Sequence, residues 1–297
     1  MPNAKFKNYL HLHFIVFVWG FTAVLGALIT IDAIPLVWYR MLIASLVVLA
    51  FLFIRKKRLT VSKKLLGWYL FGGFLIAMHW LAFFHAIKVS NVSITLAMMS
   101  TGAFFTSILE PIIFKRKLIG YEIVFGLMVI VGLYIIFRVE GDYLSGILYA
   151  LSAAFLGAVF SIINGKLVQK NNATIISFYE LLGGAGFITI YLLVTQGFTA
   201  GFFLLSATDW MYITILATFC TAYAFIASTA VMKYLTPYTV MLTINLEPVY
   251  GIFLAFLIFG EKEQMSPQFY YGALIILGTV VLNGILKNRK VKRVGAS

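Results

Sequence analysis

The chain has 297 residues, of which 62% are hydrophobic and only 11% are charged. Globular proteins average about 45–50% apolar and about 25% charged residues, so this composition excludes a disordered chain and a water-soluble enzyme. A single cysteine excludes a disulfide scaffold and a cysteine-based metal cluster. The formal net charge of +13 would suggest a nucleic-acid partner only if the basic residues formed one patch, and they are instead spread between apolar segments.

Apolar runs long enough to cross a membrane recur along the whole chain. A helix needs about 20 mostly apolar residues to span a hydrocarbon core of about 30 Å. Ten such runs are predicted, at residues 10–29, 34–54, 65–87, 92–114, 120–137, 143–165, 174–195, 209–232, 237–259 and 267–286. The connections between them are short, so the sequence predicts an all-α polytopic membrane protein with ten transmembrane helices.

The distribution of basic residues tests this helix count independently. When the N-terminus is placed in the cytoplasm, most lysines and arginines fall in cytoplasmic segments, with large groups at 55–64, 115–117 and 287–293. The loops on the other side carry acidic residues such as Asp142 and Glu261. Cytoplasmic loops are typically rich in Lys and Arg. We therefore expect a prokaryotic cell (inner) membrane protein with both termini cytoplasmic, whose positive charge faces anionic lipid rather than nucleic acid.

Two parts of the chain match weakly at an offset of 145 residues. Lys88 aligns with Lys233, and a shift of one residue aligns GLMVIVG at 126–132 with GALIILG at 272–278. Shared helix composition is the alternative explanation, and the matched glycines are expected to allow close helix contact. The predicted units are a five-helix repeat at 1–140, a second five-helix repeat at 141–287, and a basic cytoplasmic tail at 288–297. An odd number of helices per repeat inverts one repeat relative to the other.

Several short motifs occur in a fixed order along these helices. They are Trp19-Gly20, Arg40, FHAIKVSNVSITLAMMS at 84–100, Glu247-Pro248 and Gly260-Glu261. In this order they resemble the EamA family of the drug/metabolite transporter superfamily, and the resemblance covers nearly the whole chain. It implies a permease that exports or exchanges small polar metabolites such as amino acids. It also implies a central cavity formed by spans 1, 3, 4, 6, 8 and 9.

The first half departs from this pattern at two positions. Ala103 stands where the second half has Pro248, and Arg116 stands where the second half has Glu261. Because proline interrupts a helix and alanine does not, the fourth span is expected to be more regular than the ninth.

Ionisable side chains near the middle of a membrane cost about 2.5–3.5 kcal/mol each, so they are the first candidates for function. Glu247 lies about ten residues, or about 15 Å, into its span, and Pro248 after it leaves a backbone carbonyl without its helical donor. His79 lies mid-span beside Trp80. A carboxyl, an imidazole and aromatic rings can bind an amine, a carboxylate or a proton. Interhelical packing is the alternative role.

These considerations give two sets of candidate residues. The expected substrate-binding residues are His79, Trp80, Tyr223, Asn245, Glu247, Trp19 and Thr101. Arg40 and Glu180 each lie six residues into a span, at equivalent places in the inverted halves, and are expected to act as gates or charge contacts. Snorkelling of Arg40 to the nearby interface is the alternative.

The sequence lacks the motifs of several other classes. It has no phosphate-binding P-loop, zinc-protease motif or haem-attachment motif, so we expect no enzyme, catalytic residue, metal or cofactor.

The leading prediction is a secondary transporter that works by alternating access, with a small metabolite and membrane lipid as partners. The alternatives are a membrane enzyme acting on a lipid or isoprenoid, and a non-transporting scaffold or channel. Proton coupling through Glu247 or His79 fits the sequence as well as passive exchange does, and a monomer fits as well as a homodimer.

Overall fold

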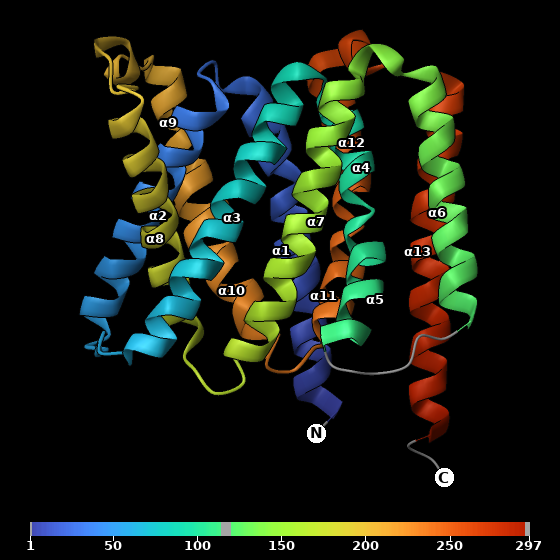
Figure 1. Cartoon of the computed structure of the whole chain (residues 1–297), viewed down its shortest axis with the longest axis horizontal. Helices are drawn as coiled ribbons and strands as arrows, with labels where there is room; N and C mark the ends of the chain where they lie inside the picture. Colours follow the sequence, from blue (N-terminus) through green and yellow to red (C-terminus); the bar gives the residue numbers. More distant parts are fainter. Residues whose placement is uncertain (1, 114–119, 295–297) are drawn as a thin grey trace.

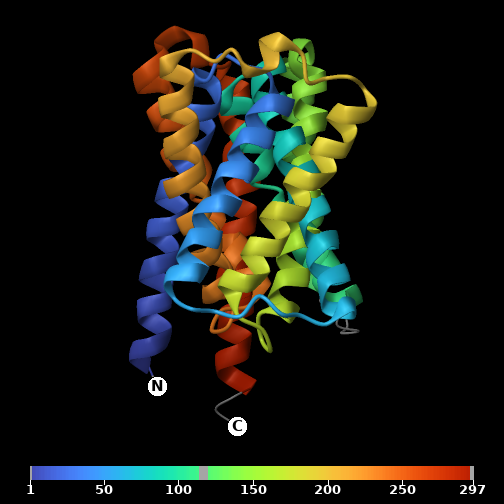
Figure 2. The same cartoon turned by 90° about the vertical axis from the view of Figure 1, so that its left-hand side faces the viewer.

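The structure is a computed structural model that describes residues 2–113 and 120–294. Its described residues form helices joined by short connections, without a strand. Figures 1 and 2 show these helices running side by side, with both termini at the same end of the bundle. The predicted basic loop at 115–117, which includes Arg116, lies outside the described residues.

The first half of the chain supplies six α-helices. They are α1 (Pro2–Leu28), α2 (Ala33–Ile54), α3 (Lys63–Val89), α4 (Val92–Met99), α5 (Gly102–Ile113) and α6 (Gly120–Val139). The second half supplies seven more. They are α7 (Leu144–Leu167), α8 (Ala173–Val194), α9 (Ala207–Ala217), α10 (Ala224–Val231), α11 (Pro237–Ile244), α12 (Glu247–Phe259) and α13 (Pro267–Val294). A π-helix, Thr218–Tyr223, joins α9 to α10. Short 3-10 turns occupy Gly141–Tyr143, Ala200–Phe203 and Gly260–Glu263.

Eight helical segments among the described residues are long and apolar enough to cross a membrane. They are Phe6–Leu28, Ala33–Ile54, Lys63–Val89, Val92–Ile113, Gly141–Leu167, Ala173–Val194, Ala207–Val231 and Thr239–Glu263. The apolar parts of α6 and α13 are shorter, at Val124–Arg138 and Pro267–Leu282. The prediction of an all-α, multi-pass membrane protein is therefore confirmed.

The two halves of the chain begin at opposite ends of the bundle. In Figure 1, α1 rises from the end that carries the termini, whereas α7 descends from the other end. A repeat that is inverted across the membrane requires this relationship. The last helix of the chain, α13, continues without a break to Val294, so the expected tail at 288–297 begins as an extension of this helix.

The last helices of the two halves, α6 and α13, cross at a pair of glycines. A Cβ atom on Gly132 would lie 2.9 Å from the carbonyl oxygen of Gly272, and a Cβ atom on Gly272 would lie 2.9 Å from that of Gly132. Ile136 and Ile276 cover the crossing from both sides. The expected close contact is therefore present here, whereas a Cβ atom on Gly278 would meet no described atom within 4 Å.

The spans expected at 92–114 and 237–259 are both interrupted. The first consists of α4 and α5, separated at Ser100-Thr101, and the second consists of α11 and α12, separated at Asn245-Leu246. The two interruptions are related by the repeat offset of 145 residues, so they occupy equivalent positions in the two halves. The expectation that the fourth span is more regular than the ninth is therefore wrong.

The first interruption involves a threonine hydroxyl, whereas the second involves a proline. The backbone N–H of Thr101 donates to the carbonyl of Met98 at 3.0 Å, and the Thr101 hydroxyl donates to the same carbonyl at 2.7 Å. The N–H of Leu246 makes the equivalent bond, three residues back, at 3.0 Å. Side-chain hydroxyls that bond to the preceding turn compete with helical hydrogen bonding, so Thr101 interrupts a helix that has Ala103 in place of Pro248.

Candidate functional site

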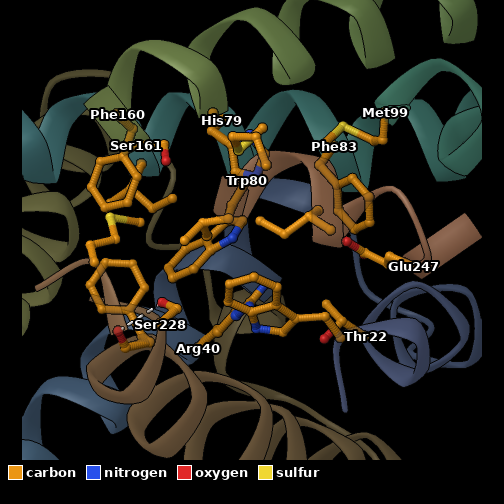
Figure 3. Close-up of a pocket in the computed structure, with 18 residues that line it drawn as sticks. Thr22, Arg40, His79, Trp80, Phe83, Met99, Phe160, Ser161, Ser228 and Glu247 are labelled. Atoms are coloured by element: carbon orange, nitrogen blue, oxygen red, sulfur yellow. Dashed lines mark hydrogen bonds between the residues drawn. The ribbon is translucent and has the colours of Figure 1, made fainter. Parts of the chain in front are cut away.

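A cavity of about 100 Å³ lies in the interior of the bundle and is lined by both halves of the chain (Figure 3). Helices α1, α2, α3 and α4 of the first half and α7, α10, α11 and α12 of the second half contribute to its wall. Its aromatic lining residues are Trp19, Trp80, Phe83, Phe160 and Phe225. Its polar lining residues are Thr22, Arg40, His79, Ser161, Ser228 and Glu247. The wall is thus mostly apolar with a few polar groups, as in most small-molecule sites.

Arg40 of α2 reaches this cavity rather than the membrane interface. Its side chain is 1% exposed, and its guanidinium carbon lies 3.9 Å from the ring centre of Trp80. Nε donates a hydrogen bond to the hydroxyl of Thr221 at 2.6 Å. Nη1 is buried and has no hydrogen-bond partner among the described residues. The guanidinium therefore holds a fixed position on the indole face with donor capacity left for a ligand.

The π-helix between α9 and α10 supplies the partners of two cavity residues. Within it, Thr221 accepts the bond from Arg40 and donates to the carbonyl of Leu216, five residues earlier, at 2.6 Å. The indole N–H of Trp19 donates to the carbonyl of Cys220 at 3.2 Å. A π-helical turn leaves backbone carbonyls free for such contacts and often occurs at functional sites.

His79 of α3 has one ring nitrogen fixed by the backbone of α7. Nδ1 lies 2.7 Å from the carbonyl oxygen of Ala153. A carbonyl only accepts, so Nδ1 carries a hydrogen and Nε2 remains available. The ring stacks on Phe83 with centroids 6.3 Å apart, and a Cβ atom on Gly157 would lie 3.1 Å from Nδ1. Gly157 therefore leaves the space that the imidazole needs.

Glu247 is the first residue of α12 and lines the cavity directly after the helix interruption. Its side chain is 7% exposed, and no ion pair joins it to Arg40 in the described parts of the chain. Pro248, which follows it, has no N–H, so the carbonyl of Ile244 lacks its helical donor. The start of a helix presents free N–H groups, which favours negative charge at this position.

The other expected binding residues lie outside the cavity. Tyr223 is 38% exposed and bonds to Nε2 of His11 at 2.9 Å. The extra residue of the π-helical turn rotates the following helix, so Phe225 and Ser228 face the cavity in place of Tyr223.

Thr101 and Asn245 are also absent from the cavity wall. Both are buried at the two helix interruptions, where the hydroxyl of Thr101 bonds within its own turn. Both side-chain amide atoms of Asn245 lack a hydrogen-bond partner among the described residues. Their neighbours Met99 and Ile244 line the cavity instead.

Glu180 lies in a separate buried place between α8 and α3. Its side chain is fully buried, packs against Gly72, and accepts a hydrogen bond from Nδ2 of Asn164 at 3.1 Å. Arg40 lines the central cavity and Glu180 does not, so the two residues that the sequence placed at equivalent positions of the inverted halves have different surroundings.

An inverted bundle of apolar helices, interrupted at equivalent positions in both halves beside an internal cavity, is an architecture found in many membrane transporters. The sequence matches the EamA-like transporter family over residues 8–138 and 144–285, one segment in each half. The chain belongs to this family, which is part of the drug/metabolite transporter superfamily, and the predicted resemblance is confirmed.

A curated relative has a transporter name, and a solved structure shares the fold. An "Uncharacterized transporter" of Clostridium kluyveri (strain ATCC 8527 / DSM 555 / NBRC 12016 / NCIMB 10680 / K1) is 26% identical over 240 residues, which cover 77% of this chain and 75% of that protein. A solved crystal structure shares the fold with a TM-score of 0.69 at 15% identity, over 94% of this chain and 98% of that chain. The protein is therefore a multi-pass membrane transporter of the drug/metabolite type with a small-molecule substrate.

Proposed function

We propose that this protein exports or exchanges small zwitterionic metabolites, such as amino acids, across a prokaryotic cell membrane. Ten membrane-spanning helices in two inverted repeats open the central cavity to each side in turn, and both termini lie in the cytoplasm. The observation that carries the proposal is the presence of a buried arginine, Arg40, and a buried carboxyl, Glu247, on one cavity without an ion pair between them.

The charges of a zwitterion complement these two groups. A buried charge without a partner is costly, and a ligand that supplies the opposite charge removes that cost. The planar guanidinium of Arg40 suits a carboxylate, for which it can offer two donors. Glu247 accepts an ammonium group, and the aromatic wall adds attraction for the same cation. A volume of about 100 Å³ favours a small substrate.

The two helix interruptions support movement around this cavity. Met99 ends α4 and Ile244 ends α11, and both side chains line the cavity. Interrupted helices allow each half-helix to tilt separately, as in other transporters with inverted repeats. A substrate bound beside them can therefore bias the bundle between its two arrangements.

Carboxylates join the two halves of the chain at the end of the bundle opposite the termini. Asp209 of α9 accepts hydrogen bonds from the backbone N–H and the hydroxyl of Thr30, each at 2.7 Å. Glu263 accepts bonds from the N–H groups of Val92 and Ser93 at the start of α4, at 3.1 and 2.9 Å. We name these two contacts the acid latches and assign them to the outer, extracytoplasmic side.

Both ends of the bundle carry a further cavity. The one at the outer end has a volume of about 500 Å³ and lies beside Thr30 and Phe202. The one at the end that carries the termini has a volume of about 440 Å³ and lies beside Gly165 and Pro237. Met232 lines both this cavity and the central one. The shared Met232 supports a path from the central cavity toward the cytoplasmic end.

Exchange of a radiolabelled L-amino acid mixture in proteoliposomes tests the proposal. Vesicles loaded with the unlabelled mixture should take up label in a saturable way, and Glu247→Gln should abolish this uptake. Glu261→Gln, which changes an exposed glutamate, is the matched control and should leave uptake unchanged. Conductance that does not saturate would identify a channel, and chemical conversion of a lipid by the purified protein would identify an enzyme.

A further inference from the structure

The fully buried carboxyl of Glu180 lies outside the substrate cavity. It faces α3, where a Cβ atom on Gly72 would collide with Oε1 and a Cβ atom on Gly73 would collide with the backbone of Glu180. The carboxyl thus packs directly against a glycine surface of the other half of the chain. So tight a contact leaves no space for a hydrated cation beside the carboxyl.

The polar groups around this carboxyl leave hydrogen-bonding capacity unused. Asn164 of α7 donates to Oε2 at 3.1 Å. Oε1 of Glu180, Oδ1 of Asn164 and the hydroxyl of Ser177 are buried and have no partner among the described residues. Ser177 lies one turn before Glu180 on the same helix. This set of groups can accept or pass on a hydrogen, which a purely apolar contact could not.

No positive charge compensates this carboxyl in the described part of the chain. The titratable residues on the helices around it are Tyr39 and Arg40 on α2, Lys63, Lys64, Tyr69, His79, His85 and Lys88 on α3, Tyr149 and Lys166 on α7, and Tyr179 and Tyr191 on α8 itself. Lys88 and Tyr39 donate to the carbonyls of Ile29 and Phe202, and His85 packs on Tyr149. Lys63, Lys64 and Lys166 are exposed, Tyr69 and Tyr179 stack on each other, and Arg40 and His79 line the substrate cavity. Helix α10 carries no charged residue. Glu247 shares its cavity with the guanidinium of Arg40, whereas Glu180 has no cationic side chain beside it in this part of the chain. Burial therefore disfavours the ionised form of Glu180 more strongly and favours the neutral carboxyl.

On each of two helices, a residue near this carboxyl lies one turn away from a residue that lines the substrate cavity. On α7, Ser161 lines the cavity and Asn164 lies three residues further on, about 4.5 Å along the helix. On α3, Gly73 packs against Glu180 and Ile76 lines the cavity at the same spacing. A shift of α3 or α7 that follows substrate binding therefore changes the surroundings of Glu180 directly.

We propose that Glu180 and Asn164 form a proton-binding site, separate from the substrate cavity, whose loading and release drive transport. The proposal rests on the transport function proposed above. When α8 separates from α3, water reaches the carboxyl, the O–H bond breaks, the proton passes to water, and a carboxylate remains. When the bundle instead opens toward the other side of the membrane, hydrated protons there reach the carboxylate, an O–H bond forms, and water is left behind. The contact between α3 and α8 then closes on the neutral carboxyl.

Infrared spectroscopy of the full-length protein in detergent tests proton binding without a substrate. The C=O stretching band of protonated, water-excluded carboxyls at neutral pH should be smaller in Glu180→Gln than in the wild type, and unchanged in Glu261→Gln. An equal band in Glu180→Gln and wild-type protein would overturn the proposal.

Transport of the radiolabelled L-amino acid mixture in proteoliposomes tests coupling. Wild-type protein should accumulate label under a pH gradient. Accumulation by Glu180→Gln should be at least about tenfold lower, while its exchange without a gradient should be retained. Accumulation by Glu180→Gln would overturn the proposal, as would loss of exchange in a correctly inserted variant, which would assign Glu180 to the structure alone. Absence of any exchange in the wild type would refute the proposed function, and the infrared comparison would still decide whether Glu180 binds a proton.

Discussion

The guanidinium of Arg40 lies 3.9 Å from the ring centre of Trp80, and both side chains are almost fully buried inside the bundle. The two residues come from adjacent helices, α2 and α3, and Thr221 of the π-helix holds the other edge of the guanidinium. This arrangement fixes a cation at the cavity wall without neutralising it. It is therefore suited to a substrate that brings its own negative charge.

Replacing Arg40 by lysine should weaken substrate binding while the protein still folds. Lysine keeps the charge but loses the planar stacking on Trp80 and the paired donors for a carboxylate. A stacked, desolvated pair contributes about 1–2 kcal/mol, so the KM for exchange should rise about 5- to 30-fold. The matched control is Arg55→Lys, since Arg55 is exposed and lies 5.4 Å from the ring centre of Phe51. An unchanged KM in Arg40→Lys would remove Arg40 from the site.

Adding a methyl group at Gly157 should impair transport because it displaces the side chain of His79. The new Cβ atom would lie 3.1 Å from Nδ1, so the imidazole would have to move away from the carbonyl of Ala153. We expect Gly157→Ala to lower the exchange rate about tenfold, consistent with the strong dependence of a site on small displacements. Gly186→Ala, where a Cβ atom meets no described atom within 4 Å, should have no effect. Equal rates in the two variants would show that His79 need not hold this position.

Weakening an acid latch should open the outer side of the cavity. Asp209→Asn removes the charge that the N–H and hydroxyl of Thr30 contact, and such charge-assisted bonds contribute about 1.5–3 kcal/mol each. In a Cys220→Ala background, a cysteine at Ser161 should react with an impermeant thiol reagent added outside at least about fivefold faster after Asp209→Asn. Asp142→Asn, at an exposed aspartate, is the control. Equal reactivity in both variants would refute the role of the latch.

The crossing of α6 and α13 should depend on its two glycines. A Cβ atom at Gly132 would lie 2.9 Å from a backbone oxygen, which has no side-chain freedom to move away. Gly132→Ala should therefore destabilise the protein by about 1–3 kcal/mol, the usual cost of overpacking. Thermal unfolding in detergent should show a lower Tm for Gly132→Ala than for Gly278→Ala, whose Cβ atom has open space. The reverse order would place the helix contact elsewhere.

Much of the fold was predictable because its signal lies in hydrophobicity and charge. Long apolar runs require helices in a membrane, where the backbone must satisfy its own hydrogen bonds. The interruption at Thr101 was missed because the sequence does not distinguish a threonine whose hydroxyl bonds to its own helix from any other threonine. Proline at 248 gave a visible signal in the other half, whereas alanine at 103 suggested regularity where the structure has none.

The candidate site was predictable only in part. Charged residues in apolar spans stand out, which led to Arg40, Glu180, His79 and Glu247. Thr221 and the π-helix carry no comparable signal, because the extra residue in a helical turn depends on packing against α1 and α2. That extra residue also rotates Tyr223 out of the site, which a regular helix would not do. Glu180 stood out by its charge, but the sequence did not show that it packs against Gly72 and Gly73 of α3 instead of lining the cavity.

The most direct measurement is exchange of the radiolabelled L-amino acid mixture by Glu247→Gln and His79→Ala in proteoliposomes, beside Glu261→Gln. The account predicts that the two cavity variants insert into the membrane but lose exchange, since Glu247 supplies the contact for the substrate ammonium and His79 supplies a free ring nitrogen at the same wall. Glu261→Gln should retain the wild-type rate. Wild-type exchange by both cavity variants would contradict a substrate site between Arg40 and Glu247.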